Sequence, residues 1–273
     1  MWEIFVAVVL GIVEGLTEFA PVSSTGHMII FDDLLFQSKD IFGREVANTF
    51  KIVIQLGSIL AVVIIFKDRF LSLLGLKKET EARKESKLKL SQVIIGLLPA
   101  AVLGFLFEDI IDKHLFTINY VVLSLLAGAI LMIVADFVQK RRTITTKSVD
   151  QITNKQALIV GLVQCIALWP GFSRSGSTMS AGVMLGMNHR TASDFTFIMA
   201  VPIMAGASGL SLIKNWEYFT LDALPFFIAG FISAFVVALI SIRFFLALIN
   251  KIKLVPFAIY RIVLAAVIYF VFL

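Results

Sequence analysis

The sequence predicts an all-α integral membrane protein, and two observations support this fold class. Hydrophobic residues make up 59% of the 273 residues and charged residues only 16%, whereas soluble domains have about 25% charged residues. The apolar residues are also gathered into long uncharged runs. About 18 such residues can cross a bilayer as a helix, because each residue rises 1.5 Å and the apolar core is about 30 Å thick. Four of these runs are Ser91 to Phe107, Ile118 to Ala135, Phe195 to Ile213 and Ala223 to Ile242.

Two basic segments orient the predicted spans. Lys67 to Lys89 carries eight Lys or Arg and four Asp or Glu, and Gln139 to Lys155 carries five Lys or Arg against Asp150 alone. Two apolar segments lie between them, so both fall on one side, which the positive-inside rule places in the cytoplasm. These loops also explain the formal charge of +5, so nucleic acid is not expected as a partner.

The segment from Lys155 to Arg190 is predicted to be a re-entrant hairpin. One complete span there would place Lys251 and Lys253 outside the cell, against the charge rule. Two complete spans are disfavoured because Gly176 to Met187 is rich in small residues. A hairpin that enters and leaves on the cytoplasmic side satisfies both conditions. Six spanning helices are then predicted near residues 50–66, 91–107, 118–138, 195–213, 225–249 and 255–273.

An internal repeat supports this topology. Gly11 to His27, GIVEGLTEFAPVSSTGH, aligns with Gly161 to Ser177, GLVQCIALWPGFSRSGS, at a constant offset of 150. Each copy begins a half-chain with three spans, so the second half is inverted relative to the first, as in many transporters. We therefore expect a single transmembrane domain over residues 1–273, with repeat one at about 1–145 and repeat two at about 146–273. A second re-entrant hairpin is expected near residues 1–36, with the two loops meeting near the bilayer midplane.

Two glutamates precede the first loop. Glu14 and Glu18 are four residues apart, so both carboxylates lie on one helix face. Ionisable groups within a span are costly and usually functional, although a solvated helix end is the plain alternative. Two close carboxylates repel each other unless a cation or a shared proton relieves them. With oxygen ligands and a phosphate substrate, Mg²⁺ or Ca²⁺ is the expected cation.

The two loops carry the groups of an oxyanion site. Ser23, Ser24, Thr25 and Gly26 begin a helix whose hydroxyls and amides can bind an anion, and His27 can transfer protons or attack phosphorus. The second copy contributes Ser173, Arg174, Ser175, Gly176 and Thr178. Arginine suits bidentate phosphate contact. Helix capping by Ser23, and a packing pair between Arg174 and Glu14 or Glu18, are the alternatives.

This set of side chains favours phosphoryl transfer over acyl transfer. The sequence has no GxxxxGK[ST] motif, so chemistry driven by ATP has no support. His114 and His189 lie in predicted loops outside the set and are expected to be solvated.

The stretches EGLTEFAPVSSTGH (Glu14 to His27) and LWPGFSRSGST (Leu168 to Thr178) resemble the two signatures of the bacterial undecaprenyl pyrophosphate phosphatases of the bacitracin-resistance type. Phe50 to Val63 and Val255 to Arg261 extend the resemblance over nearly the whole chain. The resemblance implies removal of the terminal phosphate from undecaprenyl pyrophosphate, which recycles the carrier lipid of cell-wall synthesis. It also implies a divalent cation, an inverted repeat, the bacterial plasma membrane and a site open to the extracytoplasmic side.

The resemblance also implies residue roles. Glu14 and Glu18 would serve the metal or the acid–base chemistry, and Arg174 would clamp the pyrophosphate in a pocket completed by Ser173, Ser175 and Thr178. The nucleophile would be Ser24, with His27 as its base, or His27 itself; Ser24 is favoured. The expected partners are a prenyl pyrophosphate lipid and the membrane, and a homodimer is left open. The competing hypothesis is a transporter or flippase of an anionic prenyl-phosphate lipid, which would need similar phosphate ligands.

Overall fold

The computed structural model describes residues 1–76, 87–115, 117–218 and 221–272, except the side chains of residues 108, 109, 112, 113 and 272. Within these residues every regular element is a helix, which confirms the all-α part of the prediction. The elements in chain order are α1 (Trp2–Thr17), α2 (Ser24–Met28), the π-helix η1 (Ile29–Phe36), α3 (Ser38–Phe42), α4 (Arg44–Ile65), α5 (Lys67–Leu73), α7 (Leu90–His114), α8 (Ile118–Lys140), the 3-10 helix η2 (Val149–Gln151), α9 (Asn154–Gln164), the 3-10 helix η3 (Cys165–Leu168), α10 (Arg174–Met184), α11 (His189–Lys214), the 3-10 helix η4 (Trp216–Tyr218), α12 (Leu224–Ile252) and α13 (Val255–Phe272).

Five helices of the described chain are long and apolar enough to cross a membrane, judged by length and composition: α4, α7, α8, α11 and α12. They correspond to the first five predicted spans. The sixth prediction, 255–273, falls on α13, whose apolar stretch Val255–Val271 is shorter than the other five; residue 273 lies outside the described residues. The chain is therefore a multi-pass membrane protein.

The segment predicted as the first hairpin consists of one helix, a turn and two shorter helices. α1 has 16 residues, so it rises only about 24 Å, less than the apolar core of a bilayer. After a turn at residues 18–23, α2 and η1 lead the chain back. Ring contacts close the hairpin at its start, because the Phe36 ring lies 6.1 Å from that of Trp2 and 6.2 Å from that of Phe5.

The second hairpin has the same construction. α9 and η3 lead to a turn at residues 169–173, and α10 leads back from it. Its two ends are hydrogen-bonded to each other: Gln156 Nε2 donates to the Leu185 carbonyl at 3.2 Å, and the Thr145 amide donates to the Gly186 carbonyl at 3.0 Å. The chain therefore enters and leaves this hairpin at one end of the bundle.

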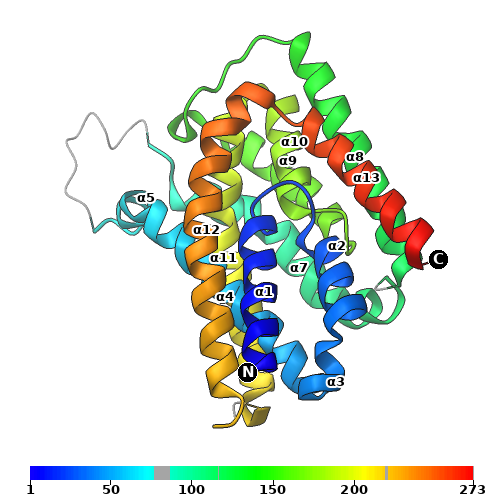
Figure 1. Cartoon of the computed structure of the whole chain (residues 1–273). Coiled ribbons are helices and arrows are strands. Elements are labelled where there is room, and N and C mark those ends of the chain that lie inside the picture. The colour runs from blue at the N-terminus through cyan, green and yellow to red at the C-terminus, as the bar shows by residue number, and fades with distance from the viewer. Residues whose placement is uncertain (77–86, 116, 219–220, 273) are drawn as a thin grey trace.

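Helix packing follows one pattern in the two halves. α1 packs along α12, α9 packs along α7, and α8 pairs with α13 (Figure 1). Gly11 and Gly161 hold matching positions, because a Cβ on Gly11 would strike the Gly230 carbonyl of α12 and one on Gly161 would strike the Gly96 carbonyl of α7. The two repeat glycines thus allow equivalent close approaches between helices.

The two basic segments lie together. Arg69 Nη1 donates to both carboxylate oxygens of Asp150 at 2.7 and 2.9 Å, and the Leu88 amide donates to the same carboxylate at 3.0 Å. The Arg190 amide also donates to Asn250 Oδ1 at 3.2 Å, which joins the start of α11 to the end of α12. In Figure 1 the connection between α8 and α9 lies at the upper end of the bundle, and the N-terminus and α3 lie at the lower end.

The prediction for His189 was wrong. This side chain is only 5% exposed, and its Nε2 lies 2.6 Å from Oδ1 of Asp136. Oδ2 of Asp136 accepts hydrogen bonds from the amides of Leu254 and Val255 at 2.9 and 3.0 Å. The sequence predicts a loop here, but His189 is the first residue of α11, and its ring is buried where it bonds Asp136 of α8. His114 is exposed, as predicted.

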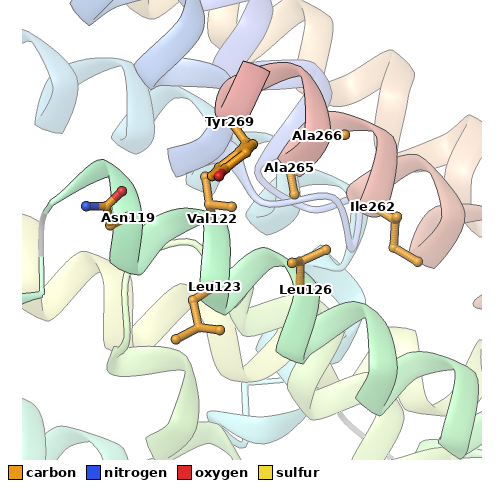
Figure 2. Close-up of a pocket in the computed structure, with 8 residues that line it drawn as sticks. All are labelled: Asn119, Val122, Leu123, Leu126, Ile262, Ala265, Ala266 and Tyr269. Carbon is orange, nitrogen blue, oxygen red and sulfur yellow. The ribbon is translucent and has the colours of Figure 1, made fainter. Parts of the chain in front are cut away.

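A crevice of about 410 Å³ lies between α8 and α13. Figure 2 shows the side chains that line it from both helices: Asn119, Val122, Leu123, Leu126, Ile262, Ala265, Ala266 and Tyr269. One amide and one phenol are its only polar side chains, so this crevice lacks the groups that phosphate chemistry requires.

Candidate active site

The two loop serines adopt the same unusual backbone conformation. Ser23 has a φ of 71° and Ser173 a φ of 72°, both in the left-handed region that residues other than glycine rarely enter. Each serine caps the following helix, because its Oγ accepts the amide hydrogen of Gly26 at 3.3 Å or of Gly176 at 3.1 Å. Strained backbone of this kind is concentrated at functional sites.

The turns of the two hairpins touch. Ser175 Oγ donates to the carbonyl of Ala20 at 3.0 Å, and Arg174 Nη2 forms an ion pair with Glu18 Oε1 at 3.0 Å. The carboxylate of Glu18 is 8% exposed and the Arg174 side chain 17% exposed. Residues more than 150 positions apart therefore share one site.

Glu18 links the hydroxyl of the first loop to the guanidinium of the second. Its other oxygen, Oε2, accepts a hydrogen bond from Ser24 Oγ at 2.7 Å. A hydroxyl bonded to a carboxylate that is itself oriented by a cation has the geometry of an activated nucleophile, its base and the group that orients the base. The predicted residues Glu18, Ser24 and Arg174 are thus brought together.

His27 has other partners. Its Nδ1 lies 2.8 Å from the carbonyl of Ser23, which can only accept, so Nδ1 carries the hydrogen. Its Nε2 lies 2.7 Å from the hydroxyl of Tyr260, and the two rings stack at 5.6 Å. In neutral His27, Nε2 therefore accepts from Tyr260. Both ring nitrogens are engaged, and neither bonds Ser24.

Tyr260 was not among the predicted site residues. It lies on α13, 233 positions after His27, within the VPFAIYR stretch (Val255 to Arg261) that the sequence offered only as part of the resemblance. A tyrosine in an apolar helix is usually a packing or interface residue. Only the approach of α13 to α2 gives it a role beside His27.

Unpartnered polar atoms mark the space beside Glu18. Among the described residues, Glu14 Oε1 and Arg174 Nη1 are buried without a hydrogen-bond partner, and the Glu14 carboxyl interacts electrostatically with Glu18 and Arg174. Buried polar groups normally form hydrogen bonds, so these two atoms without partners indicate room for a ligand between the side chains. Two carboxylates, completed by substrate oxygens and water, form a donor set that suits Mg²⁺ or Ca²⁺.

The predicted phosphate-binding residues divide into two groups: some line a cavity, and others form hydrogen bonds within the protein. Thr25 lines a cavity together with Glu14 and Ser24. Thr178 is 1% exposed and donates to the Arg174 carbonyl at 2.8 Å while accepting from Thr196 at 2.9 Å. The hydroxyls that bond within the protein, and so shape the loops, belong to Ser23, Ser173, Ser175 and Thr178.

Two cavities of opposite character flank the first loop. A polar cavity of about 460 Å³ extends from Glu14, Ser24 and Thr25 to Asp33, Lys39 and Lys51. An apolar cavity of about 560 Å³ is lined by His27 and Tyr260 and otherwise mainly by the side chains of Val13, Leu16, Ala20, Val22, Phe31, Pro256 and Phe257. A molecule with a charged head and an apolar tail fits this arrangement.

Comparison with known proteins identifies the family of this chain. The family model described as bacitracin resistance protein BacA matches residues 7–267, which include the turns of both hairpins. The chain belongs to the BacA family.

Similar BacA-family proteins cover nearly the whole chain. An undecaprenyl-diphosphatase of Geobacillus sp. (strain WCH70) is 68% identical over 270 residues, which cover 99% of this chain and 98% of the relative. The undecaprenyl-diphosphatase of Bacillus subtilis (strain 168) is 64% identical over 269 residues, covering 98% and 97%. That of Exiguobacterium sibiricum is 66% identical over 268 residues, covering 97% and 96%.

Proposed function

We propose that this chain hydrolyses undecaprenyl pyrophosphate to undecaprenyl phosphate and inorganic phosphate. The observation that carries the proposal is the shared carboxylate of Glu18, which bonds Ser24 through one oxygen and Arg174 through the other. The names of the full-length relatives support this substrate and reaction. The product is the carrier lipid of cell-wall synthesis, so the proposed role includes peptidoglycan synthesis, cell shape and bacitracin resistance.

In the proposed first step, Ser24 Oγ attacks the terminal phosphorus. Glu18 Oε2 accepts the hydroxyl proton at the 2.7 Å contact, a bond forms from Oγ to phosphorus, and the bond to the bridging oxygen breaks to release undecaprenyl phosphate. Glu18 gives this proton to the departing undecaprenyl phosphate. Water then attacks the phosphoserine, and Glu18 accepts a proton from that water. The bond from phosphorus to Oγ breaks, Glu18 returns the proton to Ser24 Oγ, and inorganic phosphate leaves. Arg174 Nη1, which has no partner among the described residues, binds the equatorial oxygens, where charge is spread in the transition state.

Attack by His27 is the less favoured route. Its Nε2 would have to leave the Tyr260 hydroxyl, and its Nδ1 is held by the Ser23 carbonyl. Ser24 needs no such rearrangement, because its hydroxyl already bonds a carboxylate. His27 and Tyr260 instead line the apolar cavity.

Glu14 and Glu18 are the proposed ligands of a divalent cation, Mg²⁺ or Ca²⁺. When bound, the cation would neutralise phosphate charge and relieve the repulsion between the two carboxylates. The unpartnered oxygen of Glu14 supports this assignment. Phosphate oxygens would be bound by Ser24, Thr25, Arg174 and the first amides of α10. The Gly176 amide is excluded from this set, because it already donates to Ser173 Oγ.

The two cavities suit the proposed substrate. The apolar cavity beside His27 would accept the first prenyl units. The polar cavity reaches Asp33, Lys39 and Lys51. Lys39 belongs to α3, which lies at the lower end of the bundle in Figure 1, opposite the connection between α8 and α9. If the basic segments face the cytoplasm of a bacterial plasma membrane, the site opens to the extracytoplasmic side.

The proposed topology has six spans and two re-entrant hairpins in an inverted repeat. Three features support it: the two similar hairpins, the equivalent glycines Gly11 and Gly161, and the packing of α1 and α9 each against a helix of the other half, α12 and α7. A cysteine introduced at residue 2 should react with an impermeant thiol reagent added outside the cell, because the first hairpin would enter from there. Reaction only from the cytoplasmic side would overturn this topology.

A transporter or flippase of a prenyl phosphate is the second candidate, because inverted repeats with broken helices are a transport architecture. Phosphate release from undecaprenyl pyrophosphate by the purified protein in detergent separates the two functions. Release that requires Mg²⁺ or Ca²⁺ and is lost in Arg174→Ala supports the phosphatase. A folded wild type that releases no phosphate with either cation would favour transport.

A further inference from the structure

Arg261 of α13 is a fully buried cation. Its Nη2 donates to the carbonyl oxygens of Ser124 at 3.3 Å and Gly171 at 3.1 Å, Nη1 lies 3.6 Å from Met132 Sδ, and Nε has no partner. Within the described part of the chain, no Asp or Glu forms an ion pair with it. A buried charge without a counter-charge is costly.

The guanidinium lies directly behind the second loop. Gly171 belongs to the turn of the second hairpin, and a Cβ on Gly176, in the first turn of α10, would lie 3.0 Å from Arg261 Nη1. The first turn of a helix carries a positive partial charge. Arg261 therefore adds a full positive charge beside the positive end of α10, and the two repel.

Anchoring the loop does not account for this charge. Ser124 Oγ already holds the loop by donating to the Pro170 carbonyl at 2.5 Å, and Ser175 Oγ ties it to Ala20 at 3.0 Å. A neutral donor could also bond the Gly171 carbonyl, so this contact does not require a charge. An anion that arrives at the first turn of α10 would balance both positive charges.

We propose that Arg261 is a positioning residue whose charge, acting through α10, makes the site prefer the pyrophosphate substrate to the monophosphate product. This inference rests on the proposed function. A pyrophosphate carries more negative charge than a monophosphate, so a buried cation stabilises it more. The preference would promote release of the product lipid, while Arg174 makes the direct contact.

The test compares binding of two ligands to the full-length protein in detergent: farnesyl methylenediphosphonate, which cannot be hydrolysed, and farnesyl phosphate. The readout is the ratio of their Kd values. Arg261→Met should lower the preference for the diphosphonate about tenfold, since close buried charges couple strongly. Ser124→Ala is the matched control, because it removes a loop anchor without changing charge, and it should weaken both ligands alike.

A second pair of variants covers the case in which Arg261→Met does not fold. Met132→Glu places a carboxylate beside the guanidinium, and Met132→Gln has the same shape without charge. Met132→Glu should lose the preference and Met132→Gln should keep it. If the ratio of the two Kd values in Arg261→Met or Met132→Glu stays within about twofold of the wild-type ratio, the inference about Arg261 is overturned and the proposed function is not. A wild type that binds neither ligand and releases no phosphate would overturn the proposed function with it.

Discussion

Ser24 and Arg174 are the first residues of α2 and α10, 150 positions apart in the aligned repeats, and both donate to the carboxylate of Glu18. Equivalent positions of two similar loops thus carry different chemistry: one a hydroxyl, the other a cation. Glu18 has no acidic counterpart, because Leu168 occupies its place in the second copy. The repeat is therefore symmetric in backbone and asymmetric in function.

Glu18→Gln should abolish most phosphate release. The amide keeps the shape and can still accept from Ser24, but it cannot take the proton, and loss of a general base costs at least about 100-fold in rate. The measurement is kcat for phosphate release from undecaprenyl pyrophosphate. Glu217→Gln, at an exposed glutamate of η4, is the control and should retain full activity. A Glu18→Gln enzyme within tenfold of the wild type would exclude Glu18 as the base.

Tyr260→Phe should lower kcat by about two- to tenfold, the effect expected from one lost hydrogen bond. The ring stack with His27 is kept and only the bond to Nε2 is lost. Tyr269→Phe, on the same helix in the crevice of Figure 2, is the matched control. If both variants match the wild type in kcat and KM, Tyr260 does not orient His27 for the reaction.

Gly161→Ala should destabilise the protein by about 1–3 kcal/mol, as overpacking does in a close interface. Its Cβ would strike the Gly96 carbonyl where α9 meets α7. Gly206→Ala is the control, because a Cβ there meets nothing within 4 Å, and it should stabilise α11 by about 0.5–1 kcal/mol. Thermal unfolding in detergent measures both. Equal Tm values for the two variants would contradict the close approach of α9 and α7.

Asp136→Ala should cost about 3–5 kcal/mol of stability, because it leaves a buried partner unpaired. The carboxylate accepts from His189 and from the amides of Leu254 and Val255, so its loss would loosen the starts of α11 and α13. Asp40→Ala, at an exposed position of α3, should change stability by no more than about 0.5 kcal/mol. A Tm for Asp136→Ala equal to that of the control would contradict this anchoring role.

The sequence by itself determined the helical membrane class, five of the helices and the two motif loops. Long uncharged runs such as Ile118 to Ala135 have few alternatives to a spanning helix, because a bilayer leaves no other partner for the backbone. The sequence also predicted Glu18, Ser24 and Arg174 as site residues, since acids, hydroxyls and an arginine are costly within apolar segments unless they have a function.

Tertiary structure alone decided which of these groups touch. Nothing local distinguishes Glu18 from His27 as the partner of Ser24, and the contact of Arg174 with Glu18 depends on how two distant hairpins meet. Tyr260, Arg261 and the buried His189 were missed for the same reason. Tyr260 and Arg261 lie in a segment whose local pattern predicts an ordinary helix, and His189 lies in a predicted loop. The environment of all three is set by helices from elsewhere in the chain. Hydrophobic patterning specifies which segments are helices, whereas side-chain chemistry between helices depends on their packing, which the pattern does not encode.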